Sequence, residues 1–208
     1  MVDQSFKVIT KAENQSKSGN PEGSIETLEQ HLEECSNDHA ARMVIARILI
    51  YDLKRTEEGA AHLRVIIGMD PDHIDARKAL VTILSAKKSN NKEVESLYEG
   101  LIARCSDAEL YNSYARFLRM QKTDFKRSEE FYKKAIALSP KRYEFHQNYA
   151  VLLLNDLKDY ETAKMELEEV LRLDPTNQPA KKNYDLLMRK KFDPEGNLIK
   201  KRKILSKR

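Results

Sequence analysis

The residue types that most often do chemistry are present in this chain, but they are not arranged for it. Five histidines are spread along the sequence without the spacing of metal ligands. The densest titratable group, Asp70, Asp72, His73 and Asp75, surrounds a proline at a break between helices, where capping residues are expected. No Gly-rich phosphate loop and no Gly-flanked nucleophilic serine occurs. We therefore expect no metal, no cofactor and no catalytic residue, and we interpret the chain as a non-enzymatic protein.

The two cysteines give no sign of a reactive or metal-binding thiol. Cys35 and Cys105 are far apart, and neither has an obvious base partner. We interpret them as reduced residues in the core or at helix ends, which favours a cytoplasmic location. No apolar run approaches the roughly 18–20 residues that a membrane span needs. Residues 1–20 lack the basic-then-apolar layout of a secretion signal.

Composition indicates a helix-rich protein with an uneven charge distribution. Charged residues make up 34% of the chain and hydrophobic residues 40%, while six Gly and six Pro are too few for the turns of an all-β fold. The net charge is +4. From Arg189 to Arg208 there are nine Lys or Arg and two acidic residues, so this segment carries about +7 and the remainder about −3. The basic character therefore belongs to the C-terminal end.

The element that organises the sequence is a pattern repeated at an interval of 35 residues. Tyr114-Ala115 recurs as Tyr149-Ala150. The other matches at this interval are Phe125 with Tyr160, Ser128 with Ala163, Tyr132 with Leu167, Ala135 with Val170, and Pro140 with Pro175. A fixed period of this size predicts stacked helical units rather than one globular core.

The same pattern divides most of the chain into units. We expect a repeat domain over residues 1–191 and a basic tail over residues 192–208. Asp38 is an expected N-cap, and Asn177 and Pro179 mark the expected start of the last helix. Pro71, Pro140 and Pro175 are expected to end units. The predicted units are about 1–36, 37–71, 72–106, 107–140 and 141–175, followed by a capping helix at 176–191.

Each unit reads as a helix, a short turn and a second helix, and this resembles the tetratricopeptide repeat over about residues 3–191. Small residues stand where two helices approach, at Ala46, Ala115 and Ala150 in the first helices. The pattern departs from the family in its period, which is 35 instead of 34, with the extra residue between this Ala and the aromatic at the turn. The resemblance implies an all-α fold, an α-solenoid with a right-handed superhelical course, built from about five helix pairs and a capping helix.

The resemblance also implies a concave groove, lined by the first helices, that binds extended or helical peptides. Counting back from the small residue predicts groove positions rich in arginine and amide side chains, which suit the carboxylates of an acidic or C-terminal peptide. A solvated helix face is the alternative. The predicted groove residues are Met43, Arg47, Ile50, Tyr51, Arg77, Val81, Asn112, Arg116, Arg119, Gln147, Val151, Leu154, Asn155 and Lys182.

The tail contains a compact basic motif, Lys200-Lys201-Arg202-Lys203. This motif resembles a nuclear-import signal, which would place the protein in the nucleus of a host that has one, or a patch that binds nucleic acid. The apolar residues between the charges also fit a basic amphipathic helix for an anionic membrane or a partner. A disordered, solubilising tail is the remaining interpretation.

The sequence thus favours a protein–protein interaction scaffold that holds a partner segment in the groove of its repeats. The alternative is a nucleic-acid-associated adaptor that uses the basic tail, and a third is a small subunit that packs on a fixed partner. The oligomeric state and the identity of the partner do not follow from the sequence.

Overall fold

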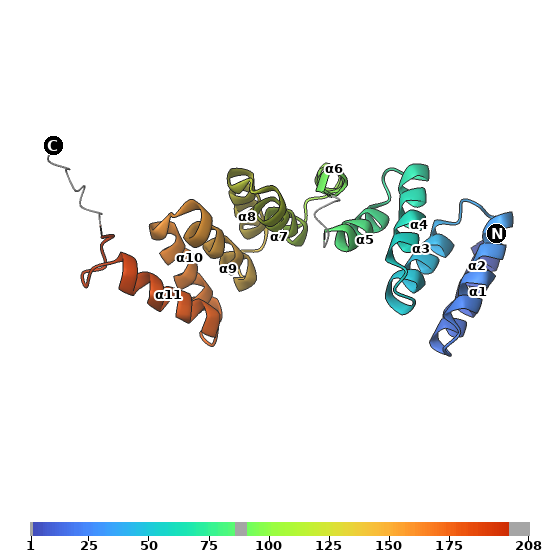
Figure 1. The fold of residues 1–208 in the computed structure, drawn as a ribbon, viewed down its shortest axis with the longest axis horizontal. Helices are drawn as coiled ribbons and strands as arrows, with labels where there is room; N and C mark the ends of the chain where they lie inside the picture. The colour runs from blue at the N-terminus through green and yellow to red at the C-terminus, as the bar shows by residue number, and fades with distance from the viewer. Residues whose placement is uncertain (1, 86–90, 200–208) are drawn as a thin grey trace, which may run out of the picture. The chain divides into compact units, whose positions relative to one another are not determined.

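A computed structural model describes residues 2–85 and 91–199. In this part the chain consists of helices joined by turns and short loops, and its only β-structure is one isolated bridge. The chain divides into two compact units, which we call unit 1 (Met1–Arg104) and unit 2 (Cys105–Arg208). Within each unit, successive helices pair and stack in chain order (Figure 1). The predicted all-α class of stacked helix pairs is confirmed.

Unit 1 contains three helix pairs, and the first helix of the second pair ends in a five-residue π-helical turn, η1. Its elements are α1 (Val2–Lys17), α2 (Pro21–Glu34), α3 (His39–Arg47), η1 (Ile48–Asp52), α4 (Thr56–Met69), α5 (Ile74–Leu84) and α6 (Asn91–Ile102).

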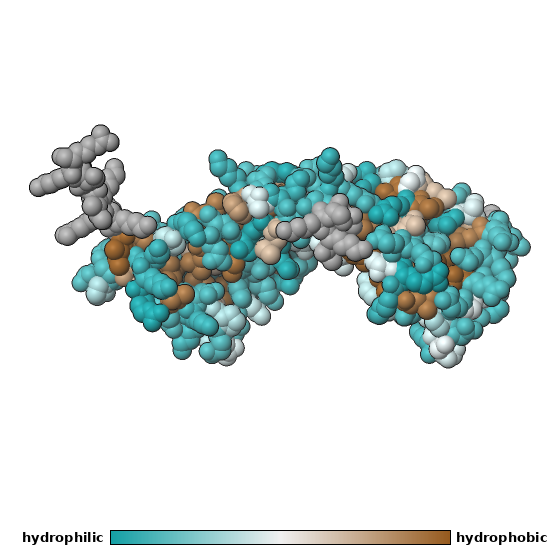
Figure 2. Space-filling view, in the orientation of Figure 1, coloured by the Kyte–Doolittle hydropathy of each residue, from teal (hydrophilic) through white to brown (hydrophobic). Residues whose placement is uncertain are grey.

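Unit 2 contains two helix pairs and one further helix. Its elements are α7 (Ala108–Phe117), η3 (Leu118–Lys122), α8 (Phe125–Leu138), α9 (Tyr143–Leu152), η4 (Leu153–Leu157), α10 (Tyr160–Leu173) and α11 (Gln178–Lys191). The helix α11 lies within residues 176–191, the range given for the predicted capping helix. Apolar surface shows brown over the region of α9, α10 and α11 (Figure 2).

Helix starts follow the capping rule read from the sequence. The Asp38 carboxylate accepts a hydrogen bond from the Ala41 N–H at 3.0 Å, and the Asn177 amide oxygen accepts one from the Ala180 N–H at 3.0 Å. Each satisfies a backbone donor that a helix N-terminus leaves without a partner. The same bond forms at the remaining Asp caps of unit 2, which are Asp107, Asp124 and Asp159.

The small residues of the repeat lie where two helices of a pair touch. The Ser128 hydroxyl on α8 donates to the Ala115 carbonyl oxygen of α7 at 2.8 Å. At the equivalent place in unit 1, a Cβ on Gly59 would lie 2.5 Å from Ile50 Cγ1 and 2.9 Å from the Ala46 oxygen. A larger residue at Gly59 would therefore have to separate α4 from α3.

The extra residue of the 35-residue period is accommodated by the π-helical turns. These turns occupy Ile48–Asp52, Leu118–Lys122 and Leu153–Leu157, each between the small residue of the first helix and the start of the second. In η1 the Leu53 N–H donates to the Ile48 oxygen at 3.1 Å, the i to i−5 bond that admits one more residue per turn. One residue shortly after each of these turns has a positive φ. Lys54 follows η1, Thr123 follows η3 and Lys158 follows η4.

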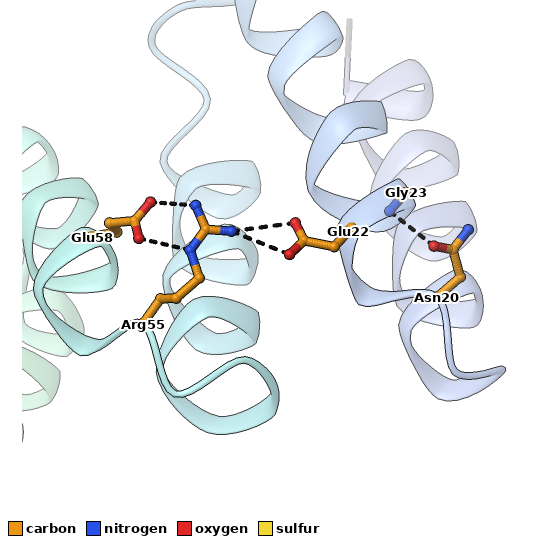
Figure 3. Close-up of polar contacts among 5 residues, drawn as sticks. All are labelled: Asn20, Glu22, Gly23, Arg55 and Glu58. Carbon is orange, nitrogen blue, oxygen red and sulfur yellow. Dashed lines mark hydrogen bonds and ion pairs between the residues drawn. The ribbon is translucent and has the colours of Figure 1, made fainter.

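Polar bridges join neighbouring helix pairs. In unit 1 the Arg55 guanidinium, just before α4, contacts Glu58 of α4 and reaches Glu22 at the start of α2 at 3.3 Å (Figure 3). Next to this bridge, the Asn20 side chain caps α2 by accepting from the Gly23 N–H at 3.0 Å. These residues are exposed, so each ion pair contributes little to stability on its own.

The chain after α11 folds back as a short hairpin over residues 191–199. Phe192 and Leu198 form the isolated antiparallel bridge, and both belong to or pack against the core of unit 2. The Lys164 ammonium of α10 lies 5.1 Å from the centre of the Phe192 ring. Residues 192–199, which the sequence analysis assigned to the tail, are thus packed against the repeats.

Candidate functional site

The predicted groove residues all lie on first helices of pairs, or on the π-turns that follow them, and on α11. In unit 1 they come from α3, η1 and α5. In unit 2 they come from α7, η3, α9, η4 and α11.

In unit 1, the charged candidates are engaged with other parts of the unit. Arg47 forms an ion pair with Glu13 of α1 at 3.1 Å, and Arg77 Nε donates to the Pro71 carbonyl oxygen at 2.8 Å. Burial, followed by the nearby charge of Arg104, lowers the pKa of Arg77.

The apolar candidates of unit 1 are mainly structural. Ile50 and Val81 are buried, and Met43 is half-buried. Tyr51, at the end of η1, is the exception, with 56% of its surface exposed. Of the candidates of unit 1, Arg47 and Tyr51 are therefore exposed, and the others are buried or half-buried.

In unit 2, three of the polar candidates also have partners. Arg119 Nε lies 2.5 Å from Asp156 Oδ2 of η4, and this pair is less than one-quarter exposed. Asn112 is buried and accepts a hydrogen bond from the Asn148 amide at 2.9 Å. These contacts tie α7 and η3 to α9 and η4.

The third hydrogen bond of this kind joins α9 to α11, because the Asn177 amide donates to Gln147 Oε1 at 3.2 Å. Asn148, Asp156 and Asn177 were not among the predicted site residues. Their offsets of 36, 37 and 30 residues from their partners differ from the repeat interval, so counting along the repeat does not find them. An open recess of about 550 Å³ lies beside Gln147, between the start of α9 and the start of α11.

The remaining candidates of unit 2 face solvent. Arg116, Asn155 and Lys182 are exposed, while Val151 and Leu154 are half-buried. Among the described residues, Arg116 and Lys182 take part in no hydrogen bond or ion pair with another side chain. Leu186, one repeat after Val151, is 41% exposed, and Arg189, one repeat after Leu154, is also exposed. Sequence reasoning missed Leu186 and Arg189, although the 35-residue interval from Val151 and Leu154 points to both.

The cationic side chains of α7 and η3 influence a buried tyrosine below them. Burial raises the pKa of Tyr132 to about 12, and the charges of Arg119 and Arg116 oppose that rise. Tyr132 is 1% exposed and packs against the Tyr149 ring, with 6.1 Å between the ring centres. This tyrosine acts as a packing residue.

Each unit buries one histidine–carboxylate pair away from the predicted groove residues. In unit 1 His31 Nε2 lies 2.8 Å from Asp38 Oδ2. In unit 2 His146 Nδ1 lies 2.7 Å from Glu166 Oε2, and His146 Nε2 lies 3.0 Å from the Pro140 oxygen. A carbonyl and an ionised carboxylate only accept, so this arrangement favours the doubly protonated ring of His146.

Burial lowers the pKa of His146, but the hydrogen bonds to Glu166 and Pro140 and the charges of Glu166 and Glu169 outweigh it and raise the pKa above its ordinary value. For Asp38, burial raises the pKa, and hydrogen bonds from Ser5, the Ala41 N–H and His31 together lower it below its ordinary value.

The titratable cluster around Pro71 has capping roles. Asp70 Oδ1 accepts from the Asp72 N–H at 3.0 Å, and His73 Nδ1 accepts from the Ala76 N–H at 3.2 Å. Over residues 2–85 and 91–199, no group of three or more His, Cys, Asp or Glu side chains is arranged to hold a metal ion. Cys35 and Cys105 are not joined in a disulfide, and both are half-buried.

The basic motif Lys200, Lys201, Arg202 and Lys203 lies outside the described residues. Its proposed roles therefore remain predictions. Among the helices of the described part, none is long and apolar enough to cross a membrane.

Comparison with protein families finds two matches, both to models described as tetratricopeptide repeat. They cover residues 108–142 and 131–165, which together run from α7 to the first part of α10 in unit 2. No curated protein matches the chain.

Solved structures with similar folds are tetratricopeptide-repeat and related proteins. MamA (41-end) from Desulfovibrio magneticus RS-1 has a TM-score of 0.71 at 18% identity, covering 85% of this chain and 98% of that one. A tetratricopeptide repeat protein from Parabacteroides merdae ATCC 43184 has a TM-score of 0.74 at 12% identity, covering 89% and 73%.

YrrB, described as a TPR protein with an unusual peptide-binding site, has a TM-score of 0.65 at 17% identity, covering 79% of this chain and 84% of its own. At these identities the likeness concerns the fold. Together the matches confirm the α-solenoid of helix pairs that the period predicts.

Proposed function

Because the chain belongs to the tetratricopeptide-repeat family, whose members typically serve as non-catalytic protein-interaction scaffolds, we propose that it binds a segment of a partner protein on the face formed by its first helices. We further propose that this segment is acidic. The observation that carries the proposal is the pair of exposed cations, Arg116 and Lys182, on the first-helix face of unit 2 without partners among the described side chains.

An exposed guanidinium can donate two parallel hydrogen bonds to a carboxylate, and an ammonium adds a point charge. Neither side chain would have to give up an existing ion pair when the partner binds. This differs from Arg47 and Arg119, which already pair with Glu13 and Asp156. A likeness to YrrB, named for a peptide-binding site, supports the same type of ligand.

The test compares the full chain with Arg116→Glu/Lys182→Glu and with a matched control, Lys126→Glu/Lys141→Glu. The control makes the same change in net charge at exposed positions on α8 and on the turn before α9. Tagged proteins are used to capture partners from host lysate, with and without nuclease, and the bound proteins are identified by mass spectrometry.

The proposal would be supported by a protein that binds to the wild type and to the control but not to Arg116→Glu/Lys182→Glu. Its capture should be unaffected by nuclease. Equal capture by all three chains would overturn it. Thermal unfolding of each variant shows whether a loss of capture reflects a loss of folding.

The nucleic-acid-associated adaptor is the second candidate, and it rests on the concentration of nine basic residues from Arg189 to Arg208. Phosphate contacts release counterions, so binding through these residues would weaken steeply as salt concentration rises. Fluorescence anisotropy with single-stranded RNA and duplex DNA, at several salt concentrations, tests it. Absence of binding at low salt would eliminate this candidate.

A further inference from the structure

The first-helix face of unit 2 has an aliphatic centre between two cationic borders. The centre, which we call the aliphatic strip, consists of Val151, Leu154 and Leu186. One border is Arg116 on α7, the first helix that precedes the strip in the chain. The other border is on α11, where Arg189 follows Leu186. Lys182 lies one turn before Leu186 on the same helix.

The three helices that carry this face are held in sequence by hydrogen bonds. Asn148 of α9 bonds to Asn112 of α7, and Asn177 at the start of α11 bonds to Gln147 of α9. The face therefore has a fixed order, with α7 first, α9 in the middle and α11 last. Arg116, Val151 and Leu186 occupy the same repeat position on these helices, at intervals of 35 residues.

The two kinds of side chain on the face differ in what they require from a ligand. Leu186 leaves 41% of its surface in water, and covering aliphatic surface is favourable for any apolar side chain of suitable size. The cations at both borders are without ion-pair partners among the described residues. A ligand that satisfies both requirements has aliphatic residues in its middle and carboxylates on either side.

The spacing of the helices indicates the form of the ligand. Packed helices lie about 8–10 Å apart, so the path from α7 across α9 to α11 is about 20 Å. An extended chain rises about 3.3 Å per residue and directs every second side chain to the same face, about 6.6 Å apart. About six extended residues therefore cross the face.

From this geometry we infer that unit 2 binds an extended segment of a partner protein in which adjacent aliphatic residues lie between acidic residues. This inference rests on the proposed function and specifies its ligand. The aliphatic residues contact the strip, and the acidic residues at the two ends contact Arg116 on α7 and Lys182 and Arg189 on α11. Unit 1 does not share this ligand, because Arg47 and Arg77 are engaged internally and Val81 is buried.

The experiment uses the full chain and three labelled synthetic peptides of equal length, measured by fluorescence anisotropy. The first has two central leucines between aspartates, the second has serines in place of the leucines, and the third has lysines in place of the aspartates. We expect the first to bind at least about tenfold more tightly than either of the others, because each comparison removes one class of contact.

Variants of the chain locate the contacts. Leu186→Ser should weaken the leucine peptide about tenfold and leave the serine peptide unchanged. Arg116→Gln and Arg189→Gln should each weaken both acidic peptides about tenfold. Lys126→Gln on α8 is the matched control and should change neither affinity.

Equal affinity for the leucine and serine peptides would overturn the inference, and so would binding that is insensitive to Leu186→Ser. Loss of the captured partner with Arg116→Glu/Lys182→Glu, together with no binding of the leucine peptide, would overturn the inference but leave the proposed function standing. Capture that is insensitive to that double variant would count against the proposed function itself.

Discussion

Units 1 and 2 are built from the same repeat, yet they use equivalent positions in different ways. Arg47 of unit 1 and Arg116 of unit 2 occupy the same place after the small alanine of a first helix. Arg47 is paired with Glu13, whereas Arg116 has no ion-pair partner among the described residues. In unit 1 the carboxylate comes from α1, the first helix of the preceding pair, whereas α9, the next first helix within unit 2, supplies no carboxylate to Arg116.

A repeat position fixes where a side chain lies but not what it contacts. Whether a side chain there stabilises the fold or remains available to a ligand depends on the residue that an adjacent pair presents to it. We expect local contacts to decide the effect of a substitution at other paired positions too, and the largest effect is expected at the buried aromatic ring near the C-terminus.

Removing an aromatic ring near the C-terminus should reduce stability far more than removing one near the N-terminus. Phe192 is 7% exposed and packs in the core of unit 2, while Phe6 of α1 is 68% exposed. Phe192→Ala should lower the free energy of unfolding of unit 2 by about 3 kcal/mol, because a buried ring is replaced by a cavity. Chemical denaturation measures this. Phe6→Ala is the matched control, and an equal effect of the two changes would contradict the packing of the hairpin.

The two glycines of α4 should respond to alanine in opposite directions. Gly59→Ala should destabilise unit 1 by about 1–3 kcal/mol, because the added methyl would collide with Ile50 and the Ala46 oxygen. Gly68 has no atom within 4 Å of an added Cβ, so Gly68→Ala should stabilise the helix by about 0.5–1 kcal/mol. Chemical denaturation of the two variants measures both changes in the free energy of unfolding. Two changes of the same sign would show that the close approach at Gly59 is not required.

The buried histidine–carboxylate pairs should give the units opposite responses to pH. The folded-state pKa of His146 is raised above 6.5, so its contribution is fully present below pH 6.5 and is lost as pH rises through the folded pKa. The pKa of Asp38 is lowered from 3.8, so its contribution is present above pH 3.8 and is lost as pH falls through the lowered value.

We therefore expect unit 2 to become less stable as pH rises above 6.5, and unit 1 to become less stable under acid conditions below pH 3.8. His146→Gln should abolish the first response, whereas His39→Gln in unit 1 should preserve it. Hydrogen exchange at several pH values, corrected for intrinsic exchange rates, measures both. A response of unit 2 that persists in His146→Gln would assign it to another group.

The smallest change in stability is expected at the residues that follow the π-helical turns and have a left-handed backbone conformation. Thr123 in unit 2 has a φ of 53°, and Lys54 in unit 1 has a φ of 61°. A β-branched side chain is strained in this region more than an unbranched one. Thr123→Gly should therefore stabilise unit 2 by about 0.5–1 kcal/mol, and Lys54→Gly should change unit 1 by less. A destabilising effect of Thr123→Gly in chemical denaturation would show that the threonine side chain holds the turn.

Much of the fold could be predicted because it depends on local rules that repeat. The small residues and the prolines each act on their own pair of helices, so the repeat interval locates most of them, and Asp38 could be recognised as a cap from its place before a helix. The sequence also located the extra residue of each repeat. It did not indicate that the backbone would form a π-helical turn there, because that choice depends on how two helices pack.

The candidate site was less predictable for a different reason. Arg116 and Arg119 look alike in the sequence, but Asp156 engages only Arg119, and that carboxylate lies 37 residues away. A contact between adjacent pairs is set by three-dimensional neighbours rather than by the repeat interval. The Pro and Gly of residues 192–196 indicate a turn, but the packing of the hairpin at 191–199 against the repeats was missed, because this segment has no second copy in the chain to reveal it.

The π-helical turns have a consequence for how such a chain can change in length. The α1–α2 pair has no such turn in α1, while η1, η3 and η4 each hold one additional residue between a small residue and the following helix. Each turn absorbs that residue before the second helix begins, so the contact between Ala46 and Gly59, or between Ala115 and Ser128, is retained. The turns are therefore sites where single-residue insertion and deletion are compatible with an intact repeat, and related chains can differ in length there while keeping the same interior.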